Sequence, residues 1–157
     1  MRKLFETEDA WNGLILRVTL GIVMFPHGAQ KLLGWYGGHG FAGTIGFFTE
    51  QMHIPLIVAF LVIIGESLGS LGLLIGLLTR FAAGSLAVIM LGAIAMVHWP
   101  HGFFMNWFGK QMGEGFEYHL LVIGLSLALV ITGGGTWSAD RVIATKMQGG
   151  GMSRKVI

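Results

Sequence analysis

Long apolar stretches of this 157-residue sequence carry side chains that can ionise. A charged group near the bilayer centre costs roughly 2.5–3.5 kcal/mol, so it persists where it pairs with another group or lines a cavity. Imidazoles and carboxylates placed in this way can exchange protons with a ligand, and imidazoles can also bind haem or a metal ion. The residues concerned are Arg17, His27, Glu66, His98, Glu117 and His119.

The two deepest of these residues predict a structural ion pair. With a rise of 1.5 Å per residue, the expected depths of Arg17 and Glu66 differ by about two helical turns, which a long arginine side chain can bridge. A buried pair of this kind would fix helix register rather than perform chemistry. In the alternative reading, Arg17 reaches the inner headgroups and Glu66 is protonated.

The remaining four residues are expected near the outer ends of their helices. His27 follows Pro26, which removes a backbone donor and can open a helix locally. We expect these residues to bind a quinone headgroup or to act as its proton partners, between walls formed by Trp35, Trp99 and Phe104. The alternative is that they are interfacial groups bonded to water or carbonyls. The ligand or proton-partner candidates are His27, His98, Glu117 and His119.

Composition restricts the class of protein. The chain is 54% hydrophobic and 11% charged, whereas a soluble domain carries about 25% charged residues, so an integral membrane protein is expected. A formal charge of only +2 gives no reason to expect a nucleic acid partner. The absence of cysteine excludes thiolate metal sites and thiol redox chemistry within the chain.

The spacing of the histidines gives only weak support for a metal-binding site. Pro100 separates His98 from His101 and interrupts a helical pairing. We therefore identify no metal ligands and no certain cofactor. A quinone is the favoured ligand, with haem or a metal as the alternative.

The apolar stretches predict an all-α membrane bundle of four spanning helices, because each is close to the roughly 20 residues that cross a bilayer. A shorter segment at 41–52 predicts an amphipathic helix on the membrane surface. Residues 1–145 are expected to form a single domain, and 146–157 a flexible cytoplasmic tail. The expected spans are about 11–33, 55–78, 81–99 and 116–132.

The distribution of basic residues predicts the orientation. An even number of spans puts both termini on one side, and most of the basic residues belong to that side. The opposite side has only Lys31 and Lys110. The positive-inside rule therefore places both termini in the cytoplasm. The residues on the side of the termini are Arg2, Lys3, Arg80, Arg141, Lys146, Arg154 and Lys155.

An ordered set of motifs over residues 11–141 resembles the DoxX family. The resemblance implies a small four-helix protein of the bacterial inner membrane. Relatives include a DoxD-type subunit associated with thiosulfate:quinone oxidoreductase. The motifs are Leu16-Arg17, Leu20-Gly21, Phe25, His27-Gly28, Gln30-Lys31, Gly34-Trp35, Gly37-Gly38, Gly43-Thr44, Phe47-Phe48, Pro55, Glu66, Gly76-Leu77-Leu78-Thr79-Arg80, His98, Gly102-Phe103-Phe104 and Gly115-Phe116-Glu117-Tyr118.

The leading hypothesis is therefore a redox-associated membrane subunit that binds quinone, at most one part of a quinone-linked oxidoreductase. With neither a flavin motif nor cysteine, the chain would need a redox partner protein to supply electrons. A homo-oligomer is the other expected assembly. The alternatives are a structural or assembly subunit without chemistry of its own, and a haem- or metal-binding membrane protein.

Overall fold

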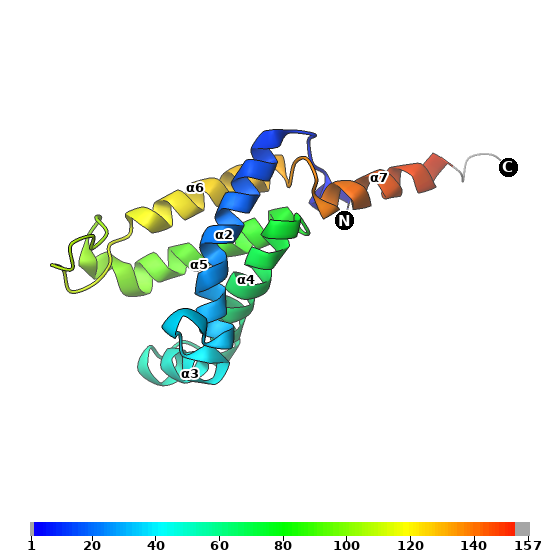
Figure 1. The fold of residues 1–157 in the computed structure, drawn as a ribbon. Helices are drawn as coiled ribbons and strands as arrows, with labels where there is room; N and C mark the ends of the chain where they lie inside the picture. The colour runs from blue at the N-terminus through cyan, green and yellow to red at the C-terminus, as the bar shows by residue number, and fades with distance from the viewer. Residues whose placement is uncertain (1, 153–157) are drawn as a thin grey trace.

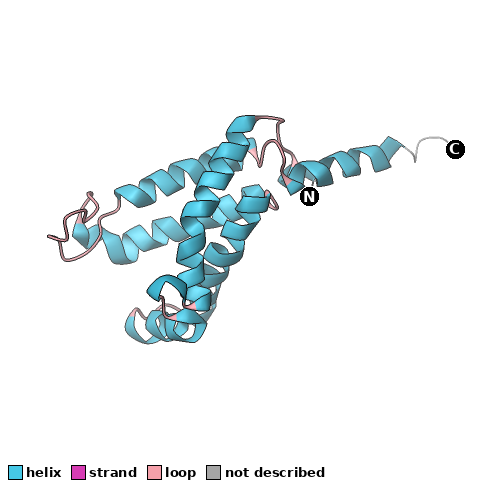
Figure 2. Ribbon diagram, in the orientation of Figure 1, coloured by secondary structure: helices cyan, strands magenta, loops and turns pink. Residues whose placement is uncertain are grey.

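The computed structural model describes the backbone of residues 2–152, and every regular element in that range is a helix. Figure 1 shows the longer helices crossing one another and α7 extending away from them. Figure 2 shows that most of the connections are short, whereas residues 102–116 form a long loop before α6. The elements are α1 (Arg2–Phe5), α2 (Trp11–Leu33), α3 (Gly40–Gly46), α4 (Leu56–Ile75), α5 (Thr79–Ala93), α6 (Glu117–Thr132) and α7 (Ala139–Met152), with short 3-10 turns at Trp35–Gly37 and Trp99–His101 and π-helical turns at Phe47–Gln51 and Ile94–His98.

The long helices pack mainly as two pairs, α2 with α4 and α5 with α6. Small residues let the first pair approach closely. A Cβ added to Gly28 would lie 2.6 Å from the Glu66 carbonyl oxygen, and the Ser67 hydroxyl donates to the Gly28 carbonyl at 3.0 Å. The core between the pairs includes Leu20, Leu73 and Leu86. The two helix pairs lie close together at the end of the molecule that holds the termini, and they diverge towards the other end (Figure 1).

The expected spans agree closely with the helices. The first helix occupies 11–33 and ends at Gly34, which has the left-handed φ of 74° that glycine adopts readily. The second expected span becomes α4, which ends in the same way at Gly76 with φ 70°. By length and composition, Leu56–Ile75 and Thr79–His101 could each cross a membrane, and Glu117–Thr132 is a shorter apolar helix. These features fit the expected helical membrane protein.

The connection after α2 contains the expected short helix. Residues 40–46 form α3, and a π-helical turn at 47–51 continues it. The prediction of a helix over 41–52 is therefore confirmed, while its position on a membrane surface stays a prediction.

The predicted flexible tail is wrong for residues 146–152. They belong to α7, whose start is fixed by the Ser138 hydroxyl accepting from the Arg141 N–H at 3.2 Å. Asp140 also ties this helix to the turn between α4 and α5. Its carboxylate accepts from the N–H groups of Leu78 and Thr79 at 2.7 and 2.8 Å. The rest of the predicted tail, 153–157, lies outside the described residues.

Arg17 does not pair with Glu66, so the predicted structural ion pair is wrong. Its guanidinium group donates to backbone carbonyls at the end of α4 and in the loop after α6, and Arg17 is 2% exposed. Glu66 instead binds Lys31 of α2. The acceptors of Arg17 are the carbonyls of Leu73, Leu74, Gly134, Thr136 and Trp137.

Candidate functional site

A row of ionisable side chains runs from the α2–α4 pair to the α5–α6 pair. At its first end the Lys31 ammonium lies 2.5 Å from Glu66 Oε2. The Glu66 side chain is 5% exposed and the Lys31 side chain 24%, so the pair is largely buried. We call this set the polar row, and its members are Lys31, Glu66, His27, Tyr118, His119 and His98.

His27 continues the row from the ion pair. It lies one turn before Lys31, on the same face of α2. The neighbouring Gly28 touches the backbone of Glu66, so His27 lies beside the contact between α2 and α4. On its other side, its ring lies 5.9 Å from the ring of Tyr118 on α6. His27 therefore connects the two helix pairs.

His119 and His98 form the other end of the row. Their ring centroids are 4.0 Å apart at an angle of 43°, and the Tyr118 ring is 5.6 Å from His119. His98 Nδ1 lies 2.8 Å from the Glu114 carbonyl oxygen. His119 is 6% exposed, and within the described part of the chain its buried Nδ1 has no hydrogen-bond partner. Such orphaned ring nitrogens are rare in buried positions.

Glu117 lies apart from the other sequence candidates. Its carboxylate accepts from the Met105 N–H at 3.0 Å and from Trp107 Nε1 at 3.2 Å, so it holds the loop between α5 and α6. Residues two apart on a helix face different sides, which explains why His119 faces the row and Glu117 does not. A role of Glu117 as a proton partner of the quinone stays a prediction.

The pocket wall formed by Trp35, Trp99 and Phe104 stays a prediction. These side chains are 53%, 66% and 67% exposed. Trp99 stacks on Phe116 at 5.4 Å, and Trp35 lies edge-on to Phe25 at 6.4 Å.

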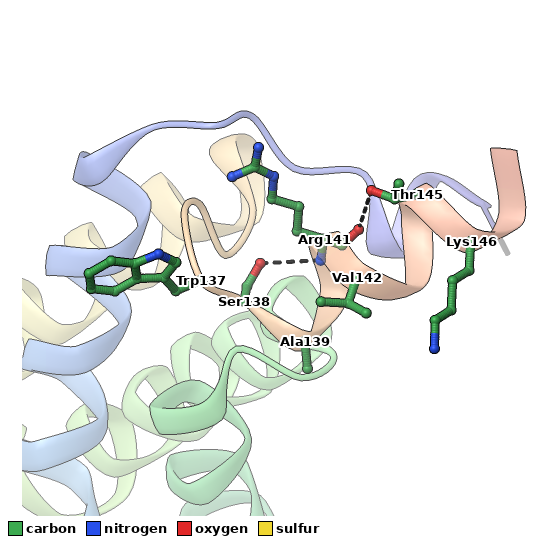
Figure 3. A pocket seen from close by; sticks show the side chains of 7 residues that line it. All are labelled: Trp137, Ser138, Ala139, Arg141, Val142, Thr145 and Lys146. Atoms are coloured by element: carbon green, nitrogen blue, oxygen red, sulfur yellow. Dashed lines mark hydrogen bonds between the residues drawn. The ribbon is translucent and has the colours of Figure 1, made fainter. Parts of the chain in front are cut away.

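Cavities lie at two other places. One of about 270 Å³ opens beside the first end of the polar row, lined by Lys31, its neighbours and residues of α3 and the following turn. The other, of about 530 Å³, lies along the start of α7 (Figure 3). The smaller cavity is lined by Gln30, Lys31, Gly37, Gly38, His39, Thr44, Phe47 and Phe48, and the larger by Trp137, Ser138, Ala139, Arg141, Val142, Thr145 and Lys146.

Metal binding gains no support from the geometry. Among the residues that the structure describes, no group of three or more His, Cys, Asp or Glu side chains is arranged to hold a metal ion.

Sequence reasoning missed two members of the row. The sequence analysis uses Lys31 only in the count of basic residues and in a motif, and Tyr118 only in a motif. The spacing of Lys31 four residues after His27 is the signal that could have placed it on the same helix face.

Comparison with known proteins supports the assignment suggested by these motifs. The chain is 33% identical over 129 residues to "Putative oxidoreductase CatD" of Bacillus subtilis (strain 168), covering 82% of this chain and 83% of that protein. No solved structure matches. Residues 13–99, which contain Lys31, Glu66, His27 and His98, match the DoxX family. The chain therefore belongs to the DoxX family.

Proposed function

We propose that this protein is a redox-associated membrane subunit that binds a quinone headgroup at the histidine end of the polar row. His119 and His98 would hydrogen-bond the headgroup oxygens, and His27 with Tyr118 would complete the polar surface around it. The similarity to a protein named as an oxidoreductase supports a redox role. The apolar helices support a ligand that is dissolved in the membrane.

The observation that carries this proposal is the buried Nδ1 of His119. A buried ring nitrogen without a partner loses free energy on the order of 1–3 kcal/mol, and a ligand oxygen would recover it. His119 also packs against a second imidazole, so two ring nitrogens that can donate or accept lie together in an apolar surrounding.

The arrangement of the helix pairs supports a route of ligand entry between them. The α2–α4 and α5–α6 pairs diverge away from the termini (Figure 1), and the row bridges them through His27 and Tyr118. A headgroup arriving from the lipid would separate these two rings slightly and reach His119 between them.

The chain would act with a partner oxidoreductase. It contains no cysteine, and its described side chains form no metal cluster, so electrons would come from a cofactor on another protein. The expected location is the bacterial inner membrane, with both termini in the cytoplasm.

The test is saturable binding of ubiquinone-1 to the full chain in nanodiscs, measured above the partition into empty nanodiscs. We expect His119→Ala to weaken binding at least tenfold, equivalent to about 1.4 kcal/mol. His53→Ala is the matched control, since His53 is exposed and lies outside the row. The proposal fails if the wild-type chain shows no saturable binding, or if both variants bind as the wild type does.

A structural or assembly role is the second candidate. The observation that favours it is the complete hydrogen bonding of Arg17, whose donors all meet backbone carbonyls. In that case, Arg17→Ala would abolish assembly of the host complex, while substitutions of His119 and His98 would leave its activity unchanged.

A further inference from the structure

We infer that the buried Lys31–Glu66 pair is a proton-transfer element, which passes protons between the cavity beside Lys31 and the histidines of the polar row. This inference rests on the proposed quinone function and assigns Glu66 and Lys31 a role in it. These residues transfer protons without contacting the quinone.

The cavity is the aqueous end of this route. It has a volume of about 270 Å³ and is lined by Lys31, Gln30, His39 and Thr44 among others. A cavity of this size with several polar groups can hold a number of water molecules. Lys31 lines this cavity and also binds Glu66 at 2.5 Å, so it joins water to a carboxylate that is itself almost fully buried.

The next proton transfer, from Glu66 to His27, takes place where the backbones of α2 and α4 pack together. The close approach of Gly28 to the Glu66 backbone and the hydrogen bond from Ser67 to the Gly28 carbonyl hold α2 against α4 at this level. His27 lies one turn before Lys31 on the same face of α2 and directly precedes Gly28, which contacts the Glu66 backbone. In the proposed route, movements of the side chains carry the proton between this imidazole and the Lys31–Glu66 pair.

The final steps run through ring contacts. His27 lies 5.9 Å from Tyr118, Tyr118 lies 5.6 Å from His119, and His119 lies 4.0 Å from His98, measured between ring centroids. All of these rings carry a group that can donate and accept a proton. The rings therefore lie side by side from His27 to the proposed quinone site, with the Tyr118 hydroxyl donating to Met24 Sδ at 3.4 Å, whereas the Glu117 carboxylate bonds the outer loop.

The stoichiometry of quinone reduction defines how many protons the polar row must supply. Reduction of a quinone to a quinol takes two electrons, here from the partner oxidoreductase, and two protons. Each carbonyl oxygen of the quinone becomes a hydroxyl. Protons leave the cavity water, pass through the Lys31–Glu66 pair to His27, and reach the oxygens through His119. Oxidation of a quinol would run the same route in reverse.

The experiment follows proton uptake by the full chain in nanodiscs loaded with ubiquinone-1. Photochemically generated deazaflavin radicals supply the electrons, and a pH-indicating dye reports the protons. We expect Glu66→Gln to bind ubiquinone-1 with unchanged affinity but to take up protons at least tenfold more slowly than the wild type. Sodium formate at pH 6 should restore the rate, because a small carboxylic acid can carry protons through the cavity. A purely structural role for Glu66 would not produce this rescue.

Lys31→Met is the second variant, in case Glu66→Gln does not fold, since Lys31 is only partly buried. It should also slow uptake and be rescued by formate. Normal quinone binding with an unchanged rate in the folded variants, or a slow rate that formate does not restore, would overturn the inference alone. Absence of binding in the wild type would overturn the proposed function, and this inference with it.

Discussion

Arg17 stabilises the fold through backbone carbonyls and not through an acidic partner. All of its hydrogen bonds go to the end of α4 and to the loop that precedes α7, so one side chain holds three elements together. Its charge also acts on Asp140 in the same region. The guanidinium group suits this role because its five N–H donors are fixed in one plane.

Replacing Arg17 by alanine should destabilise the protein strongly. Its removal leaves the backbone carbonyls that it binds without their charged donor, and each buried group left unsatisfied costs about 1–3 kcal/mol. Several such losses lower the melting temperature of a chain of this size by about 10 °C or more. Thermal unfolding of detergent-solubilised protein measures this. Arg141→Ala is the control, because its pair with Asp9 is largely exposed and worth about 0–1 kcal/mol. Equal losses in the two variants would contradict the prediction.

The sequence predicts the position of these residues along their helices, but it does not predict the direction of each side chain around the helix axis. Arg17 and Glu66 were placed correctly on neighbouring helices, yet their partners depend on which way each side chain turns. The same uncertainty grouped Glu117 with His119, although a separation of two residues puts them on different faces. Such rotations are set by packing contacts such as Gly28 against Glu66, which a single sequence does not reveal.

The polar row depends on the close packing of α2 against α4 at Gly28. A Cβ at this position would lie 2.6 Å from the Glu66 carbonyl oxygen and equally close to Ser67 Cα. Gly28→Ala should therefore force α2 and α4 apart and destabilise the protein by about 1–3 kcal/mol. The measurement is again thermal unfolding, together with proton uptake in nanodiscs.

Gly124→Ala provides the matched control for Gly28→Ala. Gly124 lies within α6 with nothing within 4 Å of an added Cβ, and alanine is the better helix former by about 1 kcal/mol. The control should be neutral or stabilising. A loss of stability at position 124 as large as that at position 28 would show that helix packing is not the cause.

Asp140 stabilises the turn between α4 and α5 from the start of another helix. It is 1% exposed, and its two carboxylate oxygens accept from the N–H groups that begin α5. Asp140→Ala should cost about 2 kcal/mol, since it removes charge-assisted bonds at a helix N-terminus. Asp140→Asn, which keeps one acceptor, should lie between the wild type and Asp140→Ala in thermal unfolding. An unchanged Asp140→Ala variant would contradict this account.

The helix limits could be predicted better than the C-terminal region. A run of about 20 apolar residues followed by a glycine, as at Gly34 and Gly76, indicates both the length and the end of a helix. The segment after Thr136 lacks such a run, and its glycines at 149–151 favour irregular structure. Ser138 before the Ala-Asp-Arg start of α7 is the helix-start signal that would have found it.

At the scale of the whole molecule, apolar side chains cover the long helices. Large exposed side chains of α4 include Leu56, Ile57, Leu61 and Leu68, and an uncovered apolar surface of this kind fits contact with lipid. The sequence assigns most of the basic residues to the side of the termini and only Lys31 and Lys110 to the other side, which is the charge bias that the positive-inside rule uses.

This bias predicts the orientation, and the absence of cysteine makes the prediction simple to test. Met112 is fully exposed in the loop between α5 and α6, so Met112→Cys should react with a membrane-impermeant maleimide in intact cells. Lys146→Cys, on α7, should react only after the inner membrane is permeabilised. The cysteine-free wild type is the background control. Labelling in the reverse order would place the cavity beside Lys31 on the cytoplasmic side, and the protons of the polar row would then come from the cytoplasm.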